Sequence, residues 1–112
     1  MTTSEEILKF WFEEIDRSFW FKKDADFDRL LAERFGALNA QASLGELSAW
    51  RDTPHGRLAE IIVLDQFSRN LFRDSAKAFG QDGMALVLAQ EAVRCGADAA
   101  LSAQERVFHD LG

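Results

Sequence analysis

The stretch that decides the fold is 57–73, RLAEIIVLDQFSRNLFR, the most apolar run in the chain. It follows Thr53 and Pro54, a pair typical of a helix start. Threonine is a favoured N-cap, and proline suits the first helical position because the amide it lacks would have no intrahelical partner. The apolar residues wrap around the helix instead of forming one stripe, a pattern typical of a helix covered on most sides. We therefore predict that this stretch is the central helix.

Polar residues follow helical spacing through the second half of the stretch. Asp65, Arg69 and Arg73 are each four residues apart, and Gln66 and Asn70 form a second pair at the same spacing. Asp65 shares its helix face with apolar residues, so its carboxylate should point into the core. A charge in that position must be paired or hydrogen-bonded, because an isolated buried charge is costly.

Two interpretations of these residues remain open. In the structural one, Asp65 and Arg69 form a buried pair while Gln66 and Asn70 tie neighbouring segments to the central helix. In the functional one, Arg69 and Arg73 face a concave surface where their guanidinium groups bind an anionic ligand, with Asp65 orienting Arg69.

The segment LDQFSRNLFR at 64–73, preceded by GRLA at 56–59, resembles the signature of the DUF924 family of bacterial proteins. The resemblance extends over nearly the whole chain. Further matching positions include Phe10-Trp11-Phe12, Trp20-Phe21, Asp24, Phe27-Asp28, Arg34-Phe35, Gly45-Glu46-Leu47, Trp50, Thr53, Ala78-Phe79, Asp82 and Glu105-Arg106. The resemblance implies an all-α fold of about five helices, similar to the antiparallel hairpins of tetratricopeptide-like repeats, and an uncharacterised biochemical function.

The sequence also departs from the family pattern. Ser68 and Gly83 stand where the family usually or often has proline. Family members continue beyond the position of Phe108 into an aromatic–Leu–Pro–Phe segment and a His-Ser-Glu motif, whereas this chain ends at Gly112. The resemblance thus implies a single helical domain over 1–112 that corresponds to the N-terminal part of the family domain, without any site that the later residues complete.

Composition narrows the class of protein. A content of 47% hydrophobic residues, with ten Phe and three Trp, supplies one modest core for 112 residues. The net charge of −6 weighs against a general nucleic-acid binder. We find no run long enough to span a membrane and no signal-peptide pattern, and a lone cysteine forms no internal disulfide. We expect a cytoplasmic protein without membrane partners.

Local signals divide the rest of the chain into helices. Thr3 with Glu6, and Ser102 with Glu105, form capping boxes that start a first and a fifth helix. A second helix is predicted over 26–44 and a fourth over 82–95, closed by Gly45 and Gly96 in left-handed caps. Gly36, inside the second helix, suggests close helix packing. Because the fifth helix is cut short, an apolar face should be left exposed. We expect either a homodimer through this face or a frayed C-terminus.

The chain lacks the common catalytic signatures. It has no nucleophile elbow, phosphate-binding loop, dinucleotide fingerprint or zinc pattern, so we predict neither a cofactor nor a metal. His55 should be exposed to solvent, and Cys95 should be a packing residue. Three functions remain: a helical module that binds a protein or peptide, a small-molecule or anion-binding protein or enzyme that uses Asp65, Arg69 and Arg73, and an oligomerising structural protein. The first is favoured.

Overall fold

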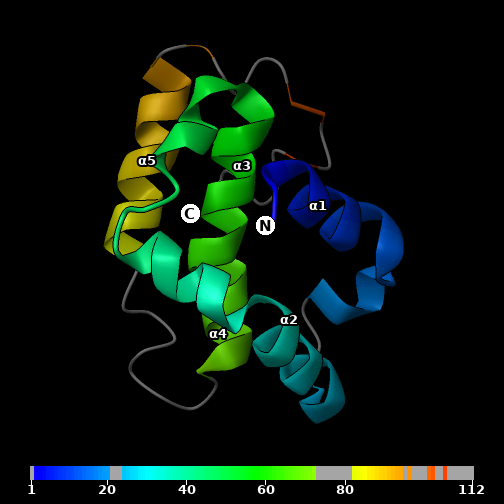
Figure 1. Cartoon of the computed structure of the whole chain (residues 1–112). Helices are drawn as coiled ribbons and strands as arrows, with labels where there is room; N and C mark the ends of the chain where they lie inside the picture. The colour runs from blue at the N-terminus through cyan, green and yellow to red at the C-terminus, as the bar shows by residue number, and fades with distance from the viewer. Residues whose placement is uncertain are drawn as a thin grey trace.

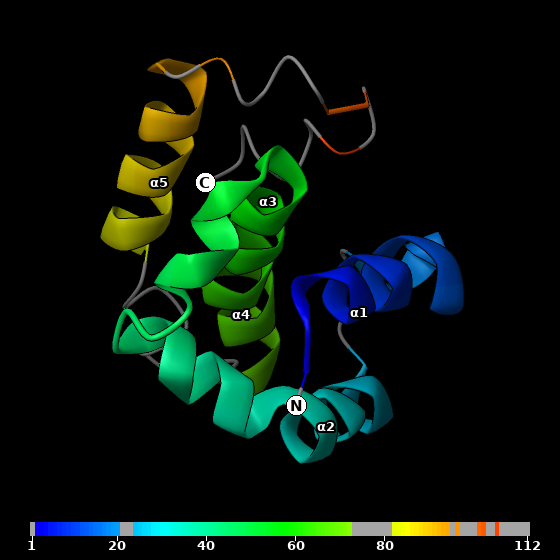
Figure 2. The same ribbon diagram turned by 45° about the horizontal axis from the view of Figure 1, so that its top comes forward.

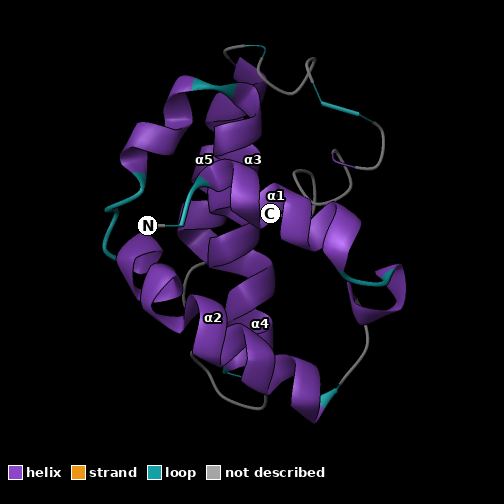
Figure 3. Cartoon of the chain, turned by 45° about the vertical axis from the view of Figure 1, so that its right-hand side comes forward, coloured by secondary structure: helices purple, strands orange, loops and turns teal. Residues whose placement is uncertain are grey.

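A computed structural model describes residues 2–20, 24–72, 82–94, 96, 101, 102 and 105 of the chain. Every regular element in these ranges is helical, and no strand appears among them (Figure 3). The predicted all-α class is therefore confirmed. Within these ranges, no helix is both long and apolar enough to cross a membrane.

The central helix begins where the sequence predicts. Helix α3, Pro54–Ile62, has Thr53 as its N-cap, and the Thr53 hydroxyl accepts a hydrogen bond from the Gly56 amide at 2.9 Å. It runs on through a π-helical turn, Val63–Phe67, into α4, Ser68–Leu71. Residues 58–68 are all buried, so this helix is covered on most sides, as its apolar pattern indicates.

The other helices surround the central one (Figures 1 and 2). Helix α1, Ser4–Lys9, continues into a second π-helical turn, Phe10–Glu14, and packs on α3. Helix α5, Asp82–Arg94, packs on α3 on the side away from α1, and α2, Ala25–Ser43, crosses beside α4. Two 3-10 turns, Arg17–Trp20 and Ser48–Asp52, connect these elements.

Aromatic rings fill the centre of the core where α1, α2 and the central helix meet. The Phe10 ring lies edge-on to Phe35 at 5.0 Å, and the Phe35 ring stacks on Phe67 at 5.4 Å between centroids. Trp11 also contacts Phe67, at 5.7 Å. Such pairs contribute about 0.5–1.5 kcal/mol each beyond the area they bury, so this cluster is a major source of stability.

Two π-helical turns are the main difference from the predicted uninterrupted helices. A π-turn disturbs the regular ladder of backbone hydrogen bonds, and side chains here supply donors to its carbonyl groups. The indole Nε1 of Trp20 donates to the Trp11 carbonyl at 2.9 Å, and Nδ2 of Asn39 donates to the Val63 carbonyl at 2.9 Å. The Asn39 amide also donates to the Ser68 hydroxyl at 2.9 Å. In each π-turn, one carbonyl group thus accepts a hydrogen bond from a side chain outside the turn.

The predicted caps are present. Gly45 and Gly96 adopt φ of 75° and 77°, which confirms both left-handed caps. The Thr3 hydroxyl accepts from the Glu6 amide, and Ser102 and Glu105 exchange the two bonds of a capping box.

The prediction for Gly36 is wrong, because a Cβ atom there would meet nothing within 4 Å. The glycine that permits close approach is Gly56, whose Cβ would overlap the backbone carbonyl oxygen of Trp50. Cys95 and the body of the fifth helix lie outside the described residues. The face predicted to form a homodimer falls largely there too.

Candidate functional site

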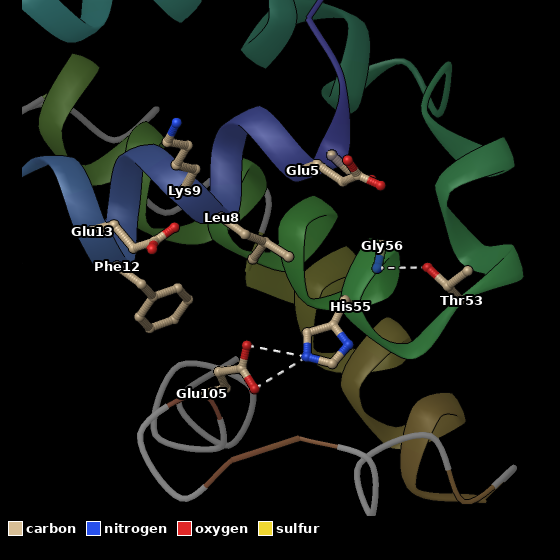
Figure 4. Close-up of a pocket in the computed structure, with 10 residues that line it drawn as sticks. Glu5, Leu8, Lys9, Phe12, Glu13, Thr53, His55, Gly56 and Glu105 are labelled. Atoms are coloured by element: carbon tan, nitrogen blue, oxygen red, sulfur yellow. Dashed lines mark hydrogen bonds and ion pairs between the residues drawn. The ribbon is translucent and has the colours of Figure 1, made fainter.

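A pocket of about 670 Å³ lies between α1 and the first turn of α3 (Figure 4). Its lining comes from three parts of the chain that are far apart in sequence: α1 with its π-turn, the start of α3, and Glu105. The lining residues are Ser4, Glu5, Leu8, Lys9, Phe12, Glu13, Thr53, His55, Gly56 and Glu105. We call this the α1–α3 pocket.

The α1 wall is amphipathic. Ile7, Phe10 and Trp11 bury one face of this helix in the core. Leu8 and Phe12 are four residues apart on the adjacent strip, so they stay partly buried, pack against the core edge and form the apolar part of the wall. Figure 4 shows both side chains directed toward His55 and Glu105. The wall therefore offers an apolar surface about one helical turn long.

The α3 wall depends on the close contact at Gly56. Because Gly56 has no side chain, the first turn of α3 lies against the backbone of Trp50, and His55 is held at the pocket edge. The Nε2 atom of His55 lies 3.2 Å from the Glu105 carboxylate. That carboxylate also accepts a hydrogen bond from the Ser102 amide at 2.8 Å. His55 is exposed to solvent, as the sequence predicts, and this contact orients its ring.

Carboxylates dominate the charge of the pocket. Glu5, Glu13 and Glu105 line it together with a single ammonium group, Lys9. Figure 4 shows Lys9 directed away from His55. Counted over the described lining residues with a neutral histidine, three negative charges against one positive give a charge of −2. Such a site favours a ligand that combines a cationic group with an apolar body. No cluster of metal-ligating side chains occurs in the described part of the chain.

The sequence motif on the central helix lies elsewhere. Asp65 has 1% of its surface exposed, and its carboxylate accepts from Gln66 Nε2 at 3.1 Å and pairs with Arg69 Nη2 at 3.1 Å. The Arg69 side chain is 40% exposed. The i,i+4 pair predicted from sequence is therefore formed, with its carboxylate end buried and its guanidinium end at the surface.

Asn70 contacts a different helix from the other motif residues. Its Nδ2 atom donates to Asp28 Oδ1 at 3.0 Å and so links the end of the central helix to α2. Arg73 lies outside the described residues. Of the motif residues that the structure describes, none lines the α1–α3 pocket. The structure thus brings Asp65, Gln66 and Arg69 together, whereas Asn70 of α4 contacts α2.

No pattern in the sequence predicts the ion pair between Arg51 and Glu60. Glu60 is fully buried in α3, and its two carboxylate oxygens each accept a hydrogen bond of 2.8 Å from Arg51. These bonds, and the charge of Glu60 with that of Glu91, raise the pKa of Arg51 above its ordinary value despite partial burial. The pair attaches the 3-10 turn Ser48–Asp52 to α3, close in sequence to the pocket residues at the start of α3.

The pocket residues had little signal in the sequence. His55 and Glu105 are 50 positions apart, and no periodicity relates them. The capping box at Ser102 identifies Glu105 as part of a helix start, and Pro54 places His55 in the first turn of α3. Those two signals define local conformation, but neither of them predicts that His55 and Glu105 meet.

Comparisons with known proteins show which family the chain belongs to. A search among curated proteins gave no match. A solved structure of a protein of unknown function from Agrobacterium tumefaciens is similar, with a TM-score of 0.90 and 38% sequence identity. The likeness covers 96% of this chain and 61% of that one, so the chain spans less than two thirds of the solved protein's length. The family model described as "Bacterial protein of unknown function (DUF924)" matches residues 7–112. The chain therefore belongs to the DUF924 family.

Proposed function

We propose that the protein is a cytoplasmic helical binding module whose α1–α3 pocket takes a segment of a partner protein or a peptide. The observation that carries this proposal is the composition of the pocket, which combines the apolar strip of Leu8 and Phe12 with the carboxylates of Glu5, Glu13 and Glu105. Tetratricopeptide-like hairpins commonly present such surfaces, and we propose that the helices here form hairpins of that kind.

The charges select the kind of segment. A partner segment with lysine or arginine next to leucine-like residues would place its cation among the carboxylates and its apolar side chain on Leu8 and Phe12. Glu5 and Glu13 are exposed, so each ion pair is screened by solvent and adds about two- to fivefold in affinity. The apolar contact would provide most of the binding free energy, and the charges would provide selectivity and a dependence on salt.

A peptide-display selection tests this proposal. We expect a randomised hexapeptide library, selected on the wild-type protein, to be enriched in basic residues beside apolar ones. Glu13→Lys should bind these peptides several-fold more weakly because it reverses a charge of the pocket. Glu33→Lys is the matched control, since it makes the same change at an exposed position of α2 that does not line the pocket. Enrichment of acidic peptides, or equal loss with both variants, would refute the proposal.

The exposed end of the Asp65–Arg69 pair supports a second candidate, a site for anionic small molecules. The Asp65 carboxylate holds Arg69 in a defined orientation while 40% of the arginine side chain remains exposed. A thermal-shift screen with anionic metabolites should then stabilise the wild type and the control Arg29→Ala, but not Arg69→Ala. Stabilisation of all three proteins by the same compounds would rule out this site.

A further inference from the structure

A second pocket, of about 460 Å³, lies where α2 faces the turn that precedes α3. It shares no residue with the α1–α3 pocket. Its lining residues are Thr2, Arg34, Ala37, Leu38, Gln41, Glu46, Leu47, Ala49 and Trp50. We call it the α2 pocket.

The body of the α2 pocket is apolar. Leu38 and Leu47 are buried core residues whose surfaces reach the pocket, and Trp50 packs against the core beside them. A leucine pair and an indole ring form the kind of surface that holds an aliphatic or aromatic ligand body. The pocket thus combines the apolar residues Leu38, Leu47 and Trp50 with the polar residues Arg34, Gln41 and Glu46.

Arg34 provides the positive charge at one end. Its guanidinium carbon lies 4.9 Å from the ring centroids of both Phe10 and Phe35, so two aromatic rings hold the group in place. Glu14 lies 3.9 Å away, beyond hydrogen-bonding distance, and both side chains of this pair are more than 40% exposed. Such an exposed pair contributes little, so it competes weakly with a ligand that binds the guanidinium group directly.

Glu46 defines the opposite end. Arg34, Leu38 and Gln41 follow one another along α2, and the rise of a helix separates the first from the last by about 10 Å. Glu46 lies beyond the C-cap of α2, on the Gln41 side. An anionic group would therefore be attracted at the Arg34 end and repelled at the Glu46 end. This polarity gives a bound molecule a single orientation.

We propose that the α2 pocket binds a small carboxylate with an apolar body. The carboxylate would accept hydrogen bonds from the Arg34 guanidinium, and the apolar body would lie over Leu38, Leu47 and Trp50. A free aliphatic acid of medium chain length matches both the separation along α2 and the positive charge of Arg34. The proposal does not depend on what binds in the α1–α3 pocket.

An NMR titration with octanoate, octanol and octylamine tests this site. Octanoate should bind saturably, shift the amide and indole signals of the pocket residues, and bind at least about tenfold more tightly than either analogue, as expected for hydrogen bonds between ionised groups. Arg34→Gln should remove this preference for the carboxylate. Because Arg34 also packs on Phe10, a second pair of variants guards against a change in folding.

Ala37→Glu and Ala40→Glu form that matched pair. Both alanines are exposed on α2, but only Ala37 lines the pocket. A carboxylate at 37 should weaken octanoate binding about two- to fivefold by repulsion and by pairing with Arg34, whereas the same change at 40 should leave affinity unchanged. Equal affinity for octanoate and octylamine, equal effects of the two variants, or no saturable binding would each overturn the proposal.

Discussion

At the scale of single residues, two glycines of the helices have opposite roles. Gly56 lies where a Cβ atom would overlap the Trp50 carbonyl oxygen, whereas Gly36 has open space around it. We expect Gly56→Ala to destabilise the protein by about 2–4 kcal/mol, because backbone must move to relieve the overlap. Gly36→Ala should stabilise it by about 0.5–1 kcal/mol, the usual difference in helix propensity. Urea unfolding measures both, and equal effects of the two changes would contradict this interpretation.

A second prediction for a single residue concerns the buried carboxylate of Glu60. Arg51→Ala would leave that carboxylate without its partner in the interior, at a cost of about 3–5 kcal/mol. Arg29→Ala is the control, because its pair with Asp26 is mostly exposed and should contribute below about 0.5 kcal/mol.

The pH dependence of this pair follows from the raised pKa of Arg51. A group whose pKa is raised by folding stabilises the protein below its unfolded value and loses that effect only as the pH rises through the folded value. Both values lie far above neutrality, so the difference between wild type and Arg51→Ala should stay constant from about pH 7 to about pH 9. If the difference in the free energy of unfolding disappeared in this range, the Arg51–Glu60 pair would not be its source.

At the scale of elements, the π-turn Val63–Phe67 depends on Asn39 of α2. The Asn39 amide donates to both the Val63 carbonyl and the Ser68 hydroxyl, and all three groups are buried. Asn39→Ala should cost about 1–3 kcal/mol because it leaves buried acceptors without a donor. Hydrogen exchange should become faster at the amides of 63–68 than at those of α5. Uniform acceleration along the chain would instead indicate a general loss of stability.

The central helix also shows how much of the fold could be predicted from the sequence. Thr53, Pro54 and the apolar run predict the start and burial of the central helix, because caps and periodicity are local properties. The π-turn does not follow from them, since it depends on a donor 24 residues away in α2. The same holds for Gly56, whose role is decided by the backbone of Trp50, whereas Gly36 has no such neighbour.

At the scale of the whole molecule, both pockets border the junction of the turn at Ser48–Asp52 with α3. Trp50 lines one pocket, and Thr53 lines the other. The described residues of the central-helix motif contribute to neither pocket, and Asp65 and Asn70 make contacts within the protein instead. The all-α class and the family could be recognised from the sequence, whereas both pockets are made by residues from separate helices that only the fold brings together.

The central claim is that the α1–α3 pocket binds a basic and apolar peptide segment. The most direct test is an NMR titration of the wild-type protein with a hexapeptide of alternating leucine and lysine, beside a counterpart in which glutamate replaces lysine. The account predicts that only the lysine peptide shifts the amide signals of Leu8, Phe12, Glu13 and His55, and that added salt weakens this binding. Equal shifts with both peptides, or shifts that avoid these residues, would contradict it.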